Sequence, residues 1–428
     1  MKSKIENSGA RRHRRIFILA TFAILLFAGI VLLYTVEFGL RVQKTRDLNK
    51  RIDNLQNLVR TNAAYNKALF KGYEKREKEA ADFFYAFTAM PYVYRPFIGF
   101  RSVPNYHHST INTNSLSYRG PEFDVVKEQG VFRILIYGGS FVWGTGALSD
   151  DETVAGHLQK ILDKSFAGQR RFEVINCGES SYRTSQEAVF LMIEGVYLNP
   201  DLVIFLDGAN DTQRWNPPLP SGYPIEFEYV NKMVSKHNPR LRKAFTIDDE
   251  LEYLKGQRDL VWSMKAESEL LSRFRRLSGC EARNKPQTGE QISPYEYALR
   301  HFYNLKSARG MGREFGFQFA FAVQPVPVAF KPLHRQEKEI LGLLKNRDPY
   351  YTILKYWEEH YITYTDAVVD LCRTEGIPVL DLKKVFENNS DPLYFDHVHV
   401  TGDGYRIVAE SLHEWLDKTG MLTPKTSD

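Results

Sequence analysis

Five short apolar runs alternate with amphipathic stretches along most of the chain, and this alternation constrains the fold more than any other feature. The runs are rich in β-branched and aromatic residues, whereas the stretches between them place apolar residues at helical spacing. Repeated strand and helix units of this kind form a parallel sheet with helices on both faces. The sequence therefore predicts an α/β fold of three layers (α/β/α) on a five-stranded parallel sheet. The expected strands are residues 132–137, 172–177, 202–206, 317–323 and 378–382, and the expected helices are 151–165, 184–198, 293–315, 361–374 and 404–418.

Residues 213–291 interrupt this alternation, because they separate the third strand from the helix that should follow it. Four prolines open the segment and its middle is charged and helix-favouring, which is too much chain for a simple crossover. We expect an insertion or lid subdomain at 213–291. The α/β domain is then divided between residues 131–212 and 292–420.

Residues 16–36 form an apolar segment without a charge or a proline. At about 1.5 Å per residue, a helix of this length spans the roughly 30 Å of a bilayer core. An arginine cluster precedes the segment and no small-residue cleavage site follows it, so a retained transmembrane helix fits better than a signal peptide or a buried core helix. The prediction is a single-pass membrane protein with a cytoplasmic tail at 1–15 and the remaining domain extracytoplasmic, periplasmic or extracellular.

Two segments connect this helix to the sheet. Residues 37–90 predict a juxtamembrane helical stalk, because they are rich in charged residues and alanine and contain no proline up to residue 90. A short apolar seam in it could support a homodimer, although a stalk helix packed on the next domain fits the two heptads better. Residues 91–130 are dense in Tyr, Asn, Pro and Gly and predict a loop-rich lead-in. The seam consists of Leu48, Ile52, Leu55 and Val59.

Charge and cysteine content exclude some classes of protein. The formal net charge of +5 is small for 428 residues and the basic residues form no long tract, so nucleic acid is not an expected partner. Three cysteines without a CxxC are too few for a disulfide framework. They are Cys177, Cys280 and Cys372.

Chemically specific residues follow four of the five predicted strands. In an open parallel sheet, ligands bind outside the carboxyl ends of the strands, so these residues are expected to meet. The four blocks are GGS with Ser140, NCGESS with Gly178, DGAND with Gly208, Asn210 and Asp211, and YFDHVHVTGDGY with Asp396 and His399.

The first and last blocks together hold the parts of a nucleophilic site. A serine hydroxyl needs a base to remove its proton, and histidine is the usual one. His399 follows Asp396 by three residues, a spacing that can bring the carboxylate onto the imidazole and set its tautomer. His397 is adjacent to Asp396, where side chains diverge, so we expect it to be a structural or rim residue.

The other two blocks suggest donors for a developing oxyanion. The amides of Ser140 and Gly178 and the side-chain amide of Asn210 could stabilise a tetrahedral intermediate. Gly178 suits this role because an absent side chain lets the backbone N–H approach a substrate. We expect Asp211 to brace the loop.

These four blocks, in this order, resemble the SGNH/GDSL hydrolase family, whose signature is a Ser block, a Gly, a GxND and a terminal DxxH. The resemblance covers residues 132–211 and 293–418, and Gly139 stands where the family's GDS has aspartate. Residues 111–123 also resemble the lead-in of membrane-associated members linked with polysaccharide modification, with Ser117 where glycine is usual. The family's fold is flavodoxin-like. Its assignments imply catalytic Ser140, Asp396 and His399, and an oxyanion hole of Ser140, Gly178 and Asn210.

The resemblance implies a serine ester hydrolase that removes O-acyl groups, in particular O-acetyl groups, from a carbohydrate or cell-envelope polymer through an acyl-enzyme. The expected partners are an acylated carbohydrate or small ester and, through residues 16–36, a membrane. No cofactor or metal is implied. Two alternatives stay open: an O-acetyltransferase on the same fold, and a non-catalytic envelope binding protein.

Other interpretations of the same residues are weaker. Ser140 could cap a helix after a Gly-Gly turn, but the other three blocks argue against that. Asp396, His397 and His399 could bind a metal, yet no further ligand has a recognisable spacing, although His107 and His108 could approach. An α/β-hydrolase is excluded because the Ser block is not G-x-S-x-G. Three aromatic side chains near the blocks, Trp143, Tyr182 and Trp215, could stack on a sugar or serve packing.

Overall fold

The computed structural model describes residues 19–47, 49–50, 73, 76–212, 293–344 and 350–423. These residues belong to two compact units, of which the first holds the N-terminal helix and the second holds the sheet. The tail at 1–15, the insertion at 213–291, the apolar seam of the stalk, Cys280 and Trp215 lie outside the described residues.

The N-terminal helix, Leu19–Asp47, is 29 residues long and none of its most apolar window is buried. The mean hydropathy of that window, 2.5, and the length of the helix are sufficient to cross a membrane. The helix runs beyond residue 36, where the predicted apolar segment ends. A helix this apolar near the N-terminus fits a membrane anchor or a signal sequence.

The five predicted strands form one parallel sheet in the order β4-β3-β5-β6-β7. The first strand of this sheet, β3, therefore lies between β4 and β5, and the direction of winding reverses there. Such a doubly wound sheet has its ligand crevice at the carboxyl ends beside the reversal, which here is the end of β3. The strands are β3 (Val131–Gly138), β4 (Arg171–Gly178), β5 (Leu202–Asp207), β6 (Gln318–Val323) and β7 (Val379–Asp381).

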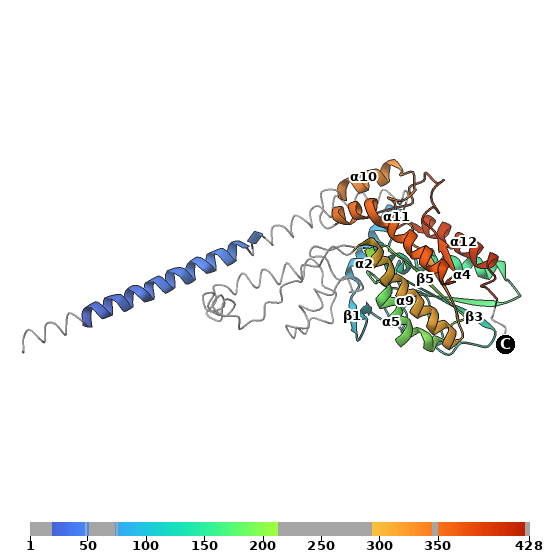
Figure 1. The fold of residues 1–428 in the computed structure, drawn as a ribbon, viewed down its shortest axis with the longest axis horizontal. Helices are drawn as coiled ribbons and strands as arrows, with labels where there is room; N and C mark the ends of the chain where they lie inside the picture. The colour runs from blue at the N-terminus through green and yellow to red at the C-terminus, as the bar shows by residue number, and fades with distance from the viewer. Residues whose placement is uncertain are drawn as a thin grey trace, which may run out of the picture. The chain divides into compact units, whose positions relative to one another are not determined.

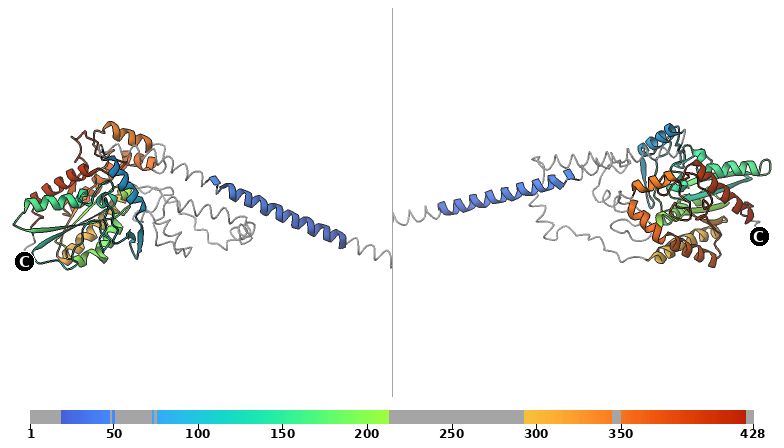
Figure 2. Two further views of the ribbon diagram at one scale, coloured as in Figure 1. Left: turned by 180° about the vertical axis from the view of Figure 1, so that it is seen from behind. Right: turned by 90° about the horizontal axis from the view of Figure 1, so that it is seen from above.

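Helices cover both faces of the sheet, which confirms the predicted three layers (Figures 1 and 2). Alternate residues of β3 serve the two faces, since Ile134 and Ile136 pack in one core and Leu135 and Tyr137 in the other. One face is covered by α4 (Val154–Ser165) and α12 (Gly402–Lys418), and the other by α5 (Thr184–Ile193), α9 (Pro294–Phe315) and α11 (Tyr350–Thr374).

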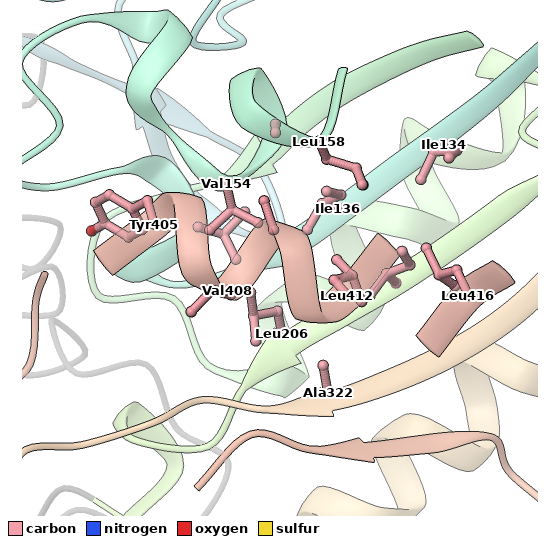
Figure 3. Close-up of a cluster of buried hydrophobic side chains, with 14 of the residues drawn as sticks. Ile134, Ile136, Val154, Leu158, Leu206, Ala322, Tyr405, Val408, Leu412 and Leu416 are labelled. Carbon is pink, nitrogen blue, oxygen red and sulfur yellow. The ribbon is translucent and has the colours of Figure 1, made fainter. Parts of the chain in front are cut away.

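The core under α12 shows why this helix forms and where it docks (Figure 3). Tyr405, Val408, Leu412 and Leu416 recur at spacings of three and four, and all four are buried against the sheet. Full burial of one such leucine contributes roughly 1.5–3 kcal/mol. Docking of this helix fixes the position of the segment that precedes it, which contains Asp396 and His399.

The end of the predicted stalk packs on the α/β domain. Helix α2 (Glu77–Ala89) buries Ala80, Phe83 and Ala86 in a cluster that also contains Trp143 and Phe395. The sequence favoured a stalk helix packed on the next domain, and α2 packs there through an apolar face that includes its aromatic residues.

The lead-in at 91–130 contains more structure than its composition predicted. It holds an antiparallel hairpin, β1 (Tyr92–Arg95) and β2 (Gly99–Ser102). Ser117 has φ +73°, a left-handed conformation that favours glycine and explains the usual glycine there. Buried Arg119 ties the lead-in to the domain through Asp150 at 2.8 Å and the Gly144 carbonyl at 2.7 Å. The remaining elements are α3 (Ser140–Trp143), α10 (Arg335–Leu344) and the 3₁₀ turns η2 (Asp150–Glu152), η3 (Gly195–Leu198) and η4 (Asn210–Thr212).

Candidate active site

Ser140 is the first residue of α3, two residues after β3 ends. Gly138 and Gly139, which precede it, are glycines because a larger side chain at either position would clash with the neighbouring loop or strand. A Cβ on Gly138 would lie 2.5 Å from the Leu206 carbonyl oxygen, and one on Gly139 would lie 2.4 Å from Asn210 Nδ2. The Gly-Gly pair therefore lets α3 start close against β5 and its following loop, with Ser140 at the carboxyl edge of the sheet.

Ser140, His399 and Asp396 form a continuous chain of hydrogen bonds. Ser140 Oγ is 2.7 Å from His399 Nε2, and His399 Nδ1 is 2.6 Å from Asp396 Oδ2. Burial alone would raise the pKa of Asp396, but the neighbouring His399 lowers it to about 2 through its charge and hydrogen bond. The carboxylate is therefore ionised and accepts from Nδ1–H, which leaves Nε2 as the acceptor for the serine proton.

Backbone contacts of Asp396 explain why the spacing of three residues works. Asp396 Oδ1 accepts the amides of Val398 at 2.8 Å and His399 at 2.6 Å. One carboxylate oxygen thus holds the turn closed while the other holds the imidazole. The turn brings residues 259 positions apart in sequence, Ser140 and His399, into contact.

The imidazole of His399 is also held from one side by Phe395. The two rings are stacked with centroids 5.8 Å apart. Phe395 in turn contacts Tyr73 and Phe84, from the segment at α2, at 5.9 and 5.7 Å. Sequence reasoning missed this support, and the aromatic residues spaced along α2 are the signal that could have found it.

His397 points away from the reacting atoms. Its ring stacks on Trp357 at 5.9 Å, and its Nδ1 lies 4.0 Å from Asp396 Oδ1. Burial lowers the pKa of His397 to about 4, against the opposing effect of the Asp396 charge. His397 was expected to be either a structural residue or a residue at the rim of the site. Its burial agrees with the structural role and not with a position at the rim.

Acidification is expected to destabilise the α/β domain through His397. Its pKa is about 4 when folded and about 6.5 in an unfolded chain, so the unfolded state binds the extra proton as the pH falls between these values. The free energy of unfolding is expected to fall by about 3 kcal/mol between pH 7 and pH 4. Urea unfolding of the full-length chain in detergent, repeated from pH 7 to 4, measures it. His397→Gln should flatten this dependence, whereas His360→Gln, at a more exposed histidine, should not. Identical slopes for wild type and His397→Gln would contradict the prediction.

The side chain of Asn210, which was proposed from the sequence as an oxyanion donor, lies next to Gly139 of the serine block. Its Nδ2 donates to the Tyr182 carbonyl at 2.8 Å and adjoins Gly139. The expected brace is also present, because Asp211 Oδ2 accepts the Thr184 amide at 3.2 Å and Asp211 Oδ1 accepts the Thr184 hydroxyl.

Gly178 does not have the geometry expected of an oxyanion donor. Its amide donates to Asn176 Oδ1 at 3.0 Å. The following amide, of Glu179, donates to the Gly138 carbonyl, so the amide of Gly178 points to the other side of β4, away from β3. A Cβ on Gly178 would lie 2.2 Å from Trp143 N, which shows that this glycine lets α3 pack on β4.

The alternatives weighed on the sequence do not fit this geometry. A metal at Asp396, His397 and His399 is disfavoured because both ring nitrogens of His399 are engaged with Ser140 and Asp396. Trp143 is buried against Phe87, and Tyr182 is buried with its hydroxyl on the Phe100 carbonyl. These two aromatic side chains therefore serve packing.

Comparison with known proteins finds similarity only among solved structures. No family model and no curated protein matches the chain. An aryl esterase of M. smegmatis is 18% identical, with 67% of this chain and 99% of that chain covered and a TM-score of 0.36. An acetyl xylan esterase is 12% identical, with coverages of 66% and 98% and a TM-score of 0.36. A carbohydrate acetylesterase family member from Sinorhizobium meliloti is 12% identical, with coverages of 68% and 99% and a TM-score of 0.36. All three of these structures are named as esterases.

Proposed function

We propose that this chain is a serine ester hydrolase of the SGNH type that acts through an acyl-enzyme, with Ser140 as nucleophile, His399 as general base and acid, and Asp396 as the residue that orients His399. The observation that carries the proposal is the unbroken Ser140–His399–Asp396 hydrogen-bond chain at the carboxyl edge of a doubly wound sheet. An ordinary helix-capping serine needs neither the histidine nor the aspartate.

In the first half-reaction, Ser140 Oγ attacks the carbonyl carbon of the ester while His399 Nε2 takes the hydroxyl proton. The tetrahedral intermediate collapses, the carbon–oxygen bond to the alcohol breaks, and His399 gives its proton to the departing alkoxide. Water then repeats the sequence on the acyl-serine and releases the acid. Asp396 stays ionised throughout and stabilises the imidazolium.

The oxyanion needs donors in place before the attack. The Ser140 amide opens α3, where the first amides of a helix have no acceptor within the helix. The side-chain amide of Asn210, which donates to the Tyr182 carbonyl, is the other proposed donor. The proposed oxyanion hole is therefore Ser140 N with Asn210 Nδ2, and Gly178 has the packing role described above.

The proposed substrate is an O-acyl ester, in particular an O-acetyl ester, on a carbohydrate or cell-envelope polymer. Two features support it: the resemblance of the motif blocks to SGNH hydrolases, and an N-terminal helix able to hold the enzyme at a membrane. We propose that this helix is a retained anchor with the α/β domain on the extracytoplasmic side. A reporter fused after Asp428 that works only outside the cytoplasm should be active, and silence there would overturn this orientation.

Full-length protein in detergent, incubated with p-nitrophenyl acetate and separately with an acetylated glycan, tests the proposed reaction. Free acetate and a transient acetyl group on Ser140, detected by mass spectrometry, are expected. Acetate that accumulates on an added sugar instead of in solution would identify an O-acetyltransferase. A folded chain that neither releases acetate nor becomes acylated would favour the non-catalytic binding protein.

A further inference from the structure

A second cluster of ionisable side chains includes Asp211, the residue that follows the proposed oxyanion donor Asn210, and has no role in the proposed hydrolysis. Asp207 ends β5, Asp211 lies in η4, and His301 comes from α9. One ligand atom from each lies within 4.8 Å of the others, and all three residues are buried. Glu187 of α5 is fully buried beside Asp207. Side chains that can bind a metal therefore come together from four elements of the domain, namely β5, η4, α5 and α9.

The orientation of these groups is unusual for a hydrogen-bonded network. His301 Nε2 is 2.9 Å from Asp207 Oδ1, but among the described residues neither atom has a partner in hydrogen-bond alignment. The other oxygen of Asp207 and both oxygens of Glu187 also accept from no aligned N–H or hydroxyl donor there, and the two carboxylates lie within hydrogen-bond reach of each other. Buried carboxylate oxygens that accept from no N–H or hydroxyl donor are costly, and carboxylate oxygens that converge with a ring nitrogen at this distance are also the arrangement around a shared cation.

The surrounding contacts also suit a metal site. Tyr364 OH is hydrogen bonded to His301 Nδ1, which orients the ring and leaves Nε2 to face the carboxylates. Thr184 donates twice to Asp211 from the opposite side. Outer contacts of this kind commonly orient ligating histidines and carboxylates.

The charges balance with a divalent cation. Asp207, Asp211 and Glu187 would carry three negative charges, and buried Arg183 supplies one positive charge. A divalent cation with neutral His301 makes this group neutral. Without a cation, the same neutrality requires both a protonated His301 and a protonated Glu187, and a protonated Glu187 would have to donate a hydrogen bond.

We infer that Asp207, Asp211 and His301 bind a divalent transition-metal cation, with Glu187 as an adjacent carboxylate. One histidine nitrogen with carboxylate oxygens is an ordinary ligand set for Zn²⁺ or Mn²⁺. The cation would be structural, because it links the end of β5 to α5 and α9 and lies outside the Ser140–His399–Asp396 chain. It would also fix Asp211, and with it the neighbouring Asn210.

Metal content of the full-length chain, purified without a metal-binding tag, tests this inference. We expect about one tightly held cation per chain by mass spectrometry, and a lower thermal midpoint after chelation that Zn²⁺ or Mn²⁺ restores. Asp207→Asn should lose most of the bound cation. Ser140→Ala should keep all of it, so a failed esterase assay and a failed metal assay remain distinguishable.

Two results would overturn the site. One is a wild-type chain that holds no cation and gains no thermal stability when Zn²⁺ or Mn²⁺ is added. The other is a cation that stays bound in Asp207→Asn. If Asp207→Asn does not fold, Glu187→Gln decides, since glutamine mimics a neutral glutamic acid. A proton-sharing network tolerates this change without loss of stability, whereas the cation site loses metal affinity and thermal stability.

Discussion

Ser140→Ala is expected to lower kcat/KM for p-nitrophenyl acetate by roughly 10⁴-fold or more, because it removes the proposed nucleophile and leaves only binding and oxyanion stabilisation. The reason lies in the geometry of the site. Ser140 Oγ is the only oxygen that the structure places against His399 Nε2 among the described residues, at 2.7 Å. Initial rates for the full-length wild type and variant in detergent measure the loss.

The controls for this prediction separate chemistry from folding. Loss of one hydroxyl at a partly exposed position should leave the thermal midpoint nearly unchanged. His399→Ala should cost about as much activity, and the double variant should be no worse, because the two residues act as one unit. Ser140→Ala with activity close to wild type would assign the observed hydrolysis to another residue.

Asp396→Asn is expected to lower kcat by about 10⁴-fold near pH 7. Asparagine cannot stabilise the imidazolium by charge, and its NH₂ group favours the wrong tautomer of His399. Its Oδ1 can still accept the amides of Val398 and His399, so the turn should persist. The measurement is kcat together with the circular dichroism spectrum of the variant.

The same substitution makes a prediction about stability in acid. The pKa of Asp396 is about 2 in the folded chain and about 3.9 when unfolded. Ionised Asp396 therefore stabilises the fold above about pH 4, and this contribution of roughly 2 kcal/mol is lost as the pH falls toward 2. Unfolding of Asp396→Asn should lack this acid-dependent step. A variant that keeps both high kcat and the wild-type acid profile would show that Asp396 does not orient His399.

Much of the fold could be predicted because hydrophobic pattern is a local property. The strands around residues 132–137 and 202–206 follow from short β-branched runs between helical stretches, and their ends are where ligands bind in any parallel sheet. The pairing of Asp396 with His399 could also be predicted, because a spacing of three residues lets one turn bring the carboxylate against the imidazole. The chemistry proposed for Ser140 could be inferred only together with the other three motif blocks of the sequence.

The features that the sequence did not predict have a common physical cause. Gly178 was expected to face the substrate, but whether a strand amide points toward one neighbour or the other depends on pairing register, which a single strand does not encode. The contact of α2 with Trp143 and Phe395 was not predicted either, because it joins segments that are distant in the sequence. The second cluster joins Asp207 to His301 across 94 positions, with no spacing pattern to reveal it.

By itself, the sequence determined the parallel α/β class, the apolar N-terminal helix and the order of the Ser, Asn and Asp–His blocks, because each depends on composition or spacing within a few residues. Only the tertiary structure decided which amides face the nucleophile, that α2 supports His399 through Phe395, and that Asp207, Asp211 and His301 converge. These outcomes depend on strand register and on packing between distant segments, and neither leaves a periodic signal in the chain.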